Sequence, residues 1–170
     1  MHLKIYQKLK LSIHKMVKLA AIRIRGGIGV SKDKKHTLNL LKLFNKNYCV
    51  ILESLATNIG MLTKVKDYIT WGEVNEETFY LLLKERGRIA GNKKLTDEYL
   101  KEKNIELKNF VEDFFTNKKT LKDIPGLKLL FRLKPPLHGF ERGGIKKPFS
   151  LGGVLGYRKD RINNLIQRML

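Results

Sequence analysis

The sequence predicts an α+β fold, a small sheet with helices packed on it. Three short runs have strand character, at residues 17–25, 48–53 and 70–74, and segments with helical spacing of apolar residues lie between them. Strands joined through helices favour crossovers onto one face of a sheet, so this order indicates a compact sandwich. A hydrophobic content of 42% in 170 residues is sufficient for a buried core.

The first two strands flank an amphipathic helix. VKLAAIRIR alternates in polarity, so the solvent face of this strand is expected to carry Lys18, Arg23 and Arg25. GGIGVS follows as a turn. Residues 33–45 are predicted to form a helix, because one face repeats at i, i+3, i+4 and i+7 through Thr37, Leu40, Leu41 and Phe44. YCVILE is the continuous apolar run typical of a central strand.

Two further helices are predicted before residue 90. The first is indicated by the helical spacing of Met61, Val65, Tyr68 and Ile69. TWGEV then forms the third strand. Asn75 suits the N-cap of the next helix, which carries Phe79, Leu82 and Leu83 and is expected to end at Gly87.

Beyond residue 90 the pattern is mainly helical. Thr96 suits the N-cap of one helix, and another is marked by Leu107, Phe110, Val111 and Phe114. Residues 127–133 alternate as in a strand that Pro135 and Pro136 end. A final amphipathic helix is predicted from Ile162, Leu165, Ile166 and Met169, with Arg158, Arg161 and Arg168 on or beside its polar face.

Charge gives the strongest functional signal. The chain has 35 basic and 16 acidic residues, a formal charge of +19 and a pI of about 10.1. Residues 53–115 hold ten basic and twelve acidic residues, whereas residues 1–25 hold seven basic residues and no acidic one. Residues 134–170 hold eight basic and two acidic residues. A near-neutral middle with two basic ends indicates a packed domain whose end segments bind a polyanion.

No motif in the sequence supports catalysis or metal binding. GGIGVSKDK fails both nucleotide-binding patterns on spacing, at Ser31, Lys32 and Asp33. The four histidines are scattered without ligand spacing, and one cysteine, Cys49, forms neither a disulfide nor a thiolate cage within one chain. We therefore expect no enzymatic activity, no metal and no cofactor.

Residues 1–16 leave several interpretations open. Leu9, Ile13, Met16 and Val17 keep helical spacing beneath a lysine-rich face, as in membrane-surface helices and transit peptides. The absence of arginine argues against a transit peptide, and the second basic region argues against a membrane helix. An arm that contacts RNA is preferred, and a solvated tail is the alternative. No run approaches the ~18 apolar residues that cross a bilayer, so we expect no membrane partner.

The segment ERGGIKKPFSLGGVLGYR, residues 141–158, combines glycine pairs with basic residues. Glycine brings the backbone close to another surface, and successive free N–H groups bind phosphate oxygens. The pairs at 143–144 and 152–153 flank Lys146, Lys147 and Phe149, so a basic loop could follow an RNA groove with an aromatic ring available to stack. A flexible surface loop explains this stretch alone equally well.

Five segments carry a specific resemblance. They are IRIRGGIG (22–29), MLTKVKDYITWGEV (61–74), RGRIAGNKKLTDEYL (86–100), IPGLKLLFRLKPP (124–136) and GGVLGYRKDRINNLIQRML (152–170). Over these segments the chain resembles the large-subunit ribosomal protein thirty family, in its archaeal and eukaryotic form. The resemblance implies a ferredoxin-like βαβαβ core with helices on one face of a small sheet, a helical and loop C-terminal extension, and no enzymatic activity.

The resemblance and the charge pattern together divide the chain. We expect a basic arm at residues 1–16, the ferredoxin-like core at 17–90, and an extension at 91–170 with the glycine-rich basic loop and the terminal helix. Archaeal-type relatives usually start close to Val17, so the arm is more similar to those of eukaryotic relatives, although it is shorter.

The resemblance further implies a place in the large subunit of the cytoplasmic ribosome. The expected partners are large-subunit rRNA, 5S rRNA as a further contact, and neighbouring large-subunit proteins, with no homo-oligomer. A free-standing RNA-binding or RNA-processing factor is the alternative. The residues expected to face RNA are Arg23, Arg25, Gly26, Lys64, Lys66, Arg86, Arg88, Lys93, Lys94, Lys134, Arg142, Gly143, Gly144, Lys146, Lys147, Gly152, Gly153, Tyr157 and Arg158.

Overall fold

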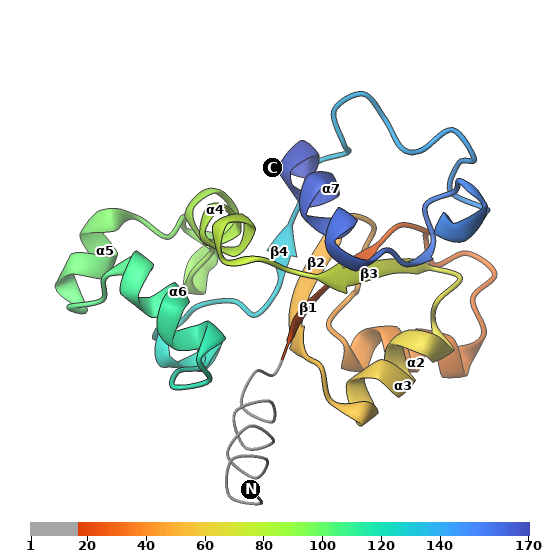
Figure 1. Ribbon diagram of the computed structural model, residues 1–170. Coiled ribbons are helices and arrows are strands. Elements are labelled where there is room, and N and C mark those ends of the chain that lie inside the picture. The colour runs from red at the N-terminus through yellow and green to blue at the C-terminus, as the bar shows by residue number, and fades with distance from the viewer. Residues whose placement is uncertain (1–16) are drawn as a thin grey trace, which may run out of the picture.

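The computed structural model describes residues 17–170, so the predicted arm at residues 1–16 lies outside the described residues. A five-stranded sheet runs through the molecule in the order β4-β2-β1-β3-β5 (Figure 1). Its strands are β1 (Lys18–Arg23), β2 (Tyr48–Glu53), β3 (Ile69–Glu73), β4 (Phe131–Arg132) and β5 (Gly156–Tyr157). The sheet is mixed, because β5 is parallel to β3 and the other pairs are antiparallel.

Strand β1 lies at the centre and pairs on both sides. Ala21 is opposite Val50 of β2 on one side and opposite Trp71 of β3 on the other. Since both neighbours are antiparallel to β1, they are parallel to each other and are joined by a crossover through α3 (Ala56–Lys64). With α2 (Lys32–Leu40) between β1 and β2, residues 18–73 form the expected βαβαβ core.

Helices cover both faces of the sheet, and alternate residues of β1 point into two separate cores. Leu19 and Ala21 pack with residues of α2 and α3. Ala20 and Ile22 pack with the later helices, which are α4 (Glu76–Arg86), α6 (Leu107–Phe115), α7 (Ile162–Met169) and, through Leu100, α5 (Asp97–Glu102). The two helices of the βαβαβ core thus share one face, and residues that follow the core fill the other (Figure 1). The predicted α+β fold class is confirmed.

Several helix boundaries agree with the capping signals. The Asn75 side chain accepts a hydrogen bond from the Thr78 N–H at 2.9 Å, and Gly87 follows the last residue of α4. Thr96 caps α5 in the same way, through the Tyr99 N–H. The final helix buries Ile162, Leu165, Ile166 and Met169, which confirms the predicted apolar face.

The second half of the predicted helix over residues 33–45 is wrong. The helix ends at Leu40, because Lys42 takes a left-handed conformation with φ 59°. The N–H of Leu43 then bonds to the Leu38 carbonyl and that of Lys42 to the Asn39 carbonyl, which is a Schellman motif. Leu43 turns inward as a result, while Leu40 and Phe44, expected on the buried face, are exposed.

Both outer strands come from the last third of the chain. Only Phe131 and Arg132 of the predicted strand at 127–133 pair with β2, and β5 had no strand signal in the sequence. Short 3-10 helices complete the chain at Ala90–Asn92, Leu121–Asp123, Phe149–Leu151 and Lys159–Arg161. Within residues 17–170 no helix is both long and apolar enough to cross a bilayer.

Candidate nucleic-acid interface

Loops from three parts of the core converge at one end of the sheet. Because β2 and β3 are antiparallel to β1, the residues after β1 lie beside those that precede β2 and β3. The Tyr68 carbonyl accepts hydrogen bonds from the N–H groups of Ile24 and Arg25, at 2.9 and 3.1 Å, and Asn47 N–H donates to the Arg23 carbonyl at 2.7 Å. We call residues 24–36, 44–48 and 64–68 the basic end of the sheet.

The basic end brings together four of the expected site residues, Arg25, Gly26, Lys64 and Lys66, and the lysine side chains are exposed. It also adds Lys34 and Lys46, which the sequence reasoning missed. Lys46 lies beside Gly26, since a Cβ placed on Gly26 would be 3.1 Å from its Cε atom. The sequence did offer a signal for Lys46, which lies just before β2. Because β2 is antiparallel to β1, a residue just before β2 lies beside the end of β1.

Tyr68 anchors two of these cations. The Arg25 guanidinium lies 5.2 Å and the Lys34 ammonium 5.5 Å from the centre of the Tyr68 ring. Arg25 also donates to the Asp67 carbonyl, and Lys34 pairs with the Asp67 carboxylate at 3.8 Å. The loop after β1, the start of α2 and the turn before β3 are therefore held in one arrangement.

Arg23 does not face solvent, contrary to the sequence-based expectation. Its side chain is 4% exposed and donates to the carbonyls of Arg25, Leu43 and Phe44 at 2.9, 2.7 and 2.6 Å. Burial lowers the pKa of this guanidinium. Arg23 therefore holds the loops of the basic end together from inside, and we withdraw it as an RNA contact.

Lys18, also expected on the solvent face of β1, is buried as well. Its ammonium donates to Glu53 at 3.0 Å and to Asn117 at 2.8 Å, and it lies 4.5 Å from the centre of the Phe114 ring. The physical reason is the same for Lys18 and Arg23. Since β1 is the central strand and both faces are covered, its polar side chains are satisfied within the protein.

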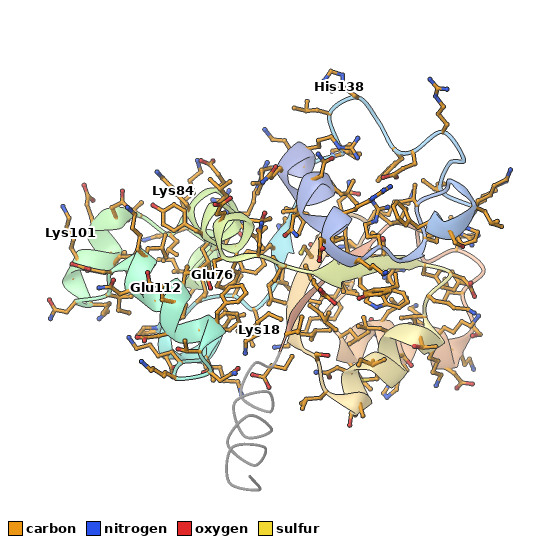
Figure 2. All side chains as sticks on the ribbon, in the orientation of Figure 1. Lys18, Glu76, Lys84, Lys101, Glu112 and His138 are labelled. Atoms are coloured by element: carbon orange, nitrogen blue, oxygen red, sulfur yellow. The ribbon has the colours of Figure 1, made fainter. Side chains whose placement is uncertain are left out.

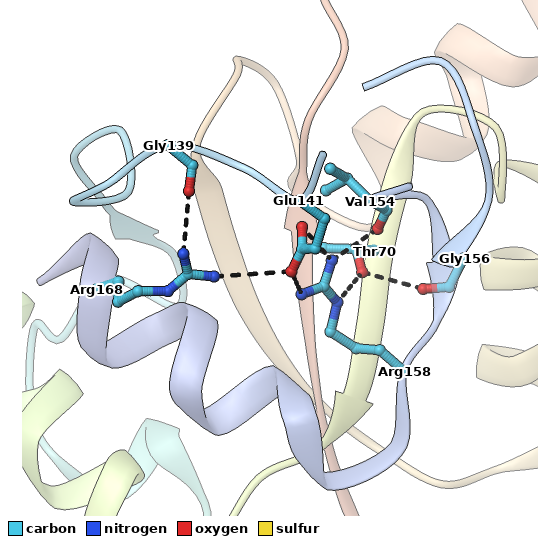
Figure 3. A network of polar contacts seen from close by, with 7 residues as sticks. All are labelled: Thr70, Gly139, Glu141, Val154, Gly156, Arg158 and Arg168. Carbon is cyan, nitrogen blue, oxygen red and sulfur yellow. Dashed lines mark hydrogen bonds and ion pairs between the residues drawn. The ribbon is translucent and has the colours of Figure 1, made fainter. Parts of the chain in front are cut away.

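The glycine-rich segment folds against β3 around Arg158, which is 2% exposed (Figure 3). The guanidinium donates to both oxygens of Glu141, at 2.8 and 3.4 Å. It also donates to Thr70 Oγ1 and to the Val154 carbonyl, each at 2.8 Å. Burial lowers the pKa of Arg158 and Glu141 opposes that shift. Arg158 is thus a structural residue whose donors are used internally, and we no longer propose it as an RNA contact.

Two of the segment's glycines serve close packing. A Cβ on Gly153 would be 2.1 Å from the Lys147 carbonyl oxygen, and a Cβ on Gly143 would be 2.6 Å from that of Gly152. Gly143 N–H donates to the Gly152 carbonyl at 2.9 Å, so the two glycine pairs face each other. Gly144 and Gly152 have positive φ and open space around them. The buried Gly153 cannot offer its backbone to a phosphate, and we withdraw it as a contact.

Several basic side chains of the segment remain exposed around this packed centre. They are Arg142, Lys146 and Lys147, and Lys134, which precedes the segment, is exposed as well. Tyr157 is exposed beside them, and burial together with a 2.9 Å hydrogen bond from its hydroxyl to Glu73 raises its pKa. The Phe149 ring is less available than expected, since the guanidinium groups of Arg158 and Arg161 lie 4.6 and 5.8 Å from its centre.

The remaining expected residues form a separate cluster after α4. Arg88 and Lys94 form an isolated β-bridge, while Lys93 and Lys94 are exposed. Arg86 is half-buried and donates to the backbone oxygen of Leu170, next to α7. This cluster lies at the C-terminal end of α4 and on the connection to α5, and it is not part of the basic end.

Charge has the opposite balance on α5 and α6. Residues 97–115 hold six acidic and three basic side chains. Figure 2 shows Lys101 and Glu112 on these helices, on the opposite side of the molecule from the glycine-rich segment. Residues 97–115 therefore carry a net negative charge, in contrast to the exposed cations of the basic end and of the glycine-rich segment.

Residues 17–170 contain no group of three or more His, Cys, Asp or Glu side chains arranged to hold a metal ion. Cys49 is buried, and burial raises the pKa of its thiol. The fold and the surface thus define a small basic α+β protein whose exposed cations suit a polyanion.

Comparison with known proteins gives the family. A family model described as Ribosomal protein L30p/L7e matches residues 19–69. The large ribosomal subunit protein uL30 of Methanopyrus kandleri is 46% identical over 149 residues, which cover 86% of this chain and 100% of the relative. That of Nanoarchaeum equitans is 47% identical over 156 residues, covering 91% and 100%. That of Hyperthermus butylicus is 47% identical over 171 residues, covering 92% of each.

The chain belongs to the ribosomal protein L30p/L7e family. The resemblance found in the sequence is confirmed, and so is the ferredoxin-like core that it implied. Members of this family have a structural role and not a catalytic one, so the protein is not an enzyme.

Proposed function

We propose that this protein is a structural constituent of the large ribosomal subunit and binds large-subunit rRNA through its exposed basic loops. The observation that carries the proposal is the match, over most of the chain, to relatives named as large ribosomal subunit proteins. The formal charge of +19 supports a polyanionic partner. Such a protein works in the ribosome of the cytoplasm.

The proposed RNA contacts are the expected residues that stay accessible. At the basic end they are Arg25, Gly26, Lys64 and Lys66, and from the last residue of α4 onward they are Arg86, Arg88, Lys93 and Lys94. In the glycine-rich segment they are Arg142, Gly143, Gly144, Lys146, Lys147, Gly152 and Tyr157, and Lys134 before the segment is a further one. Their mechanism is charge neutralisation with release of counterions, together with recognition of shape.

The finer placement is part of the same proposal. We place the protein near the 5S RNA region, as a single copy beside neighbouring large-subunit proteins, and not as a homo-oligomer. The division into an arm at 1–16, a core at 17–90 and an extension at 91–170 is proposed as well. The core supplies the basic end and the extension supplies the glycine-rich segment, so both parts contribute to the RNA surface.

Sedimentation tests the proposal. Cell lysate is run on a sucrose gradient in high-salt buffer, and the fractions are probed for this chain. We expect it in the large-subunit and intact-ribosome peaks, because contacts of complementary shape with rRNA and protein neighbours hold the chain when salt weakens the phosphate contacts. Recovery at the top of the gradient would contradict the proposal and favour a free-standing RNA-binding factor.

A further inference from the structure

Ile28 is the most exposed large apolar side chain among residues 17–170. Its relative exposure is 102%, against 71% for Leu151 and 60% for Leu40. A single exposed apolar residue is ordinary on a protein surface and needs no explanation by itself. Ile28 differs in two respects, which are the way its loop is held and the charge that surrounds it.

The loop that carries Ile28 is fixed at its base. Arg23 bonds to the carbonyls of Arg25, Leu43 and Phe44, and a Cβ on Gly27 would already be 3.4 Å from the Arg23 guanidinium. Gly29 turns the chain back with φ +71°, a conformation that glycine adopts without strain. The isoleucine is therefore held outward at the tip of a tight turn.

Basic residues flank this tip along the chain and across the end of the sheet. Arg25 precedes it, Lys32, Lys34 and Lys35 follow in the first turn of α2, and Lys46 lies against Gly26. The nearby acids are Asp33 in the same turn and Asp67, which pairs with Lys34. An apolar tip within a group of cations does not fit the centre of a protein interface, where charged residues are depleted.

The arrangement fits an RNA surface instead. Phosphates lie around an unpaired or unstacked base, and the face of the base is apolar. Proteins that bind nucleic acids place aliphatic side chains against such faces while lysine and arginine neutralise the flanking phosphates. A Cβ placed on Gly29 would have no atom within 4 Å, so the loop leaves room for RNA to approach closely.

We infer that Ile28 packs on the face of an unstacked base of the large-subunit rRNA, with Arg25, Lys34 and Lys46 on the adjacent phosphates. This inference rests on the proposed function. According to this inference, the basic end makes an apolar contact with a base in addition to its phosphate contacts. It should therefore prefer an RNA site where a base is accessible.

The test compares variants in binding to protein-free rRNA, purified from large subunits of the cells that make the protein, over a series of salt concentrations. Ile28→Ser is expected to weaken binding about tenfold or more, because burial of the isoleucine is lost. The slope of log affinity against log salt should not change, since no phosphate contact is removed. Lys46→Ala should instead reduce the slope by about 1. Leu40→Ser, an exposed leucine on α2, is the matched control and should bind as the wild type does.

The outcomes test the inference about Ile28 and the proposed function separately. Suppose that the wild type binds with a steep salt slope and that Ile28→Ser binds with the same affinity. That result would overturn the inference while the proposed function stands. Normal binding of Ile28→Ser to free rRNA with poor incorporation into large subunits would also overturn it, and would show that the isoleucine contacts a protein. Wild-type binding without salt dependence would instead contradict the proposed function. Circular dichroism of each variant confirms that the fold is kept.

Discussion

Arg158 and Glu141, 17 residues apart, form a two-point ion pair that closes the glycine-rich segment over β3 (Figure 3). Arg168 of α7 reaches the same carboxylate at 3.7 Å and donates to the Gly139 carbonyl at 3.0 Å. One carboxylate thus ties the segment to the sheet and to the last helix. The exposed lysines of the segment owe their positions to this buried network.

Glu141→Gln should therefore loosen the segment without unfolding the core. The substitution keeps the shape of the side chain but leaves the buried Arg158 without its counter-charge, and we expect a loss of about 2 kcal/mol in the free energy of unfolding. Urea denaturation measures the loss, and hydrogen exchange should show faster exchange within residues 139–158. Glu77→Gln, on the exposed side of α4, is the control. Equal stability of the two variants would contradict the role assigned to Glu141.

Gly153→Ala should be more damaging than Gly152→Ala. The first places a methyl group 2.1 Å from the Lys147 carbonyl oxygen, and we expect a cost of about 2 kcal/mol or more. The second meets open space and costs about 1 kcal/mol, because only the left-handed backbone with φ +77° is disfavoured. Thermal unfolding of both variants measures the difference. The reverse order would show that the packing around Gly153 is not as described.

Substitutions at Arg23 and Arg25 should separate effects on stability from effects on RNA binding. Arg23→Met removes a buried guanidinium that bonds three carbonyls, so we expect a loss of about 3 kcal/mol in stability as those acceptors lose their donor. Arg25→Met should leave stability within about 0.5 kcal/mol, as expected for a surface substitution, and weaken binding to rRNA. Chemical denaturation and filter binding are run on both variants. A stable Arg23→Met that only loses RNA affinity would restore Arg23 as an RNA contact.

Cys49 should resist thiol reagents until the protein unfolds. The side chain is fully buried in β2, and burial raises the pKa of the thiol, so the reactive thiolate is absent from the native state. Labelling at pH 8 is expected to be slow and to accelerate sharply in urea above the unfolding midpoint. In a Cys49→Ala background, Thr63→Cys on the exposed side of α3 should label at once. Rapid labelling of native Cys49 would show that β2 opens readily.

The elements of the core were predictable because local signals specify them. The Asn75 cap, the apolar run at 48–53 and the apolar face of the last helix each agree with the structure. The early end of α2 was not predictable in this way. It depends on a left-handed lysine at position 42, where sequence patterns lead one to expect glycine. Strand β5 was missed because its two residues pair with β3 only through long-range contacts.

The candidate site was predictable only in part. A lysine or arginine is expected to be exposed, and for Lys64, Lys66, Lys146 and Lys147 that expectation agrees with the structure. It fails where a basic residue lies on a strand covered on both sides or pairs with a carboxylate distant in the sequence. Arg23 and Arg158 are such residues, and their partners, backbone carbonyls and Glu141, cannot be recognised from spacing.

The most direct test of the account is a comparison of two triple charge reversals in binding to purified large-subunit rRNA. One changes Lys64, Lys66 and Lys146 to Glu, and the other changes Lys101, Lys103 and Lys108 on the acidic side, so both alter the net charge by the same amount. We predict that the first variant loses most of its affinity and that its log–log salt slope falls by about 2 to 3, at about 0.7 to 0.9 for each phosphate contact. The second should bind nearly as the wild type does. An equal loss in both variants would contradict a defined RNA surface and leave only a general effect of net charge.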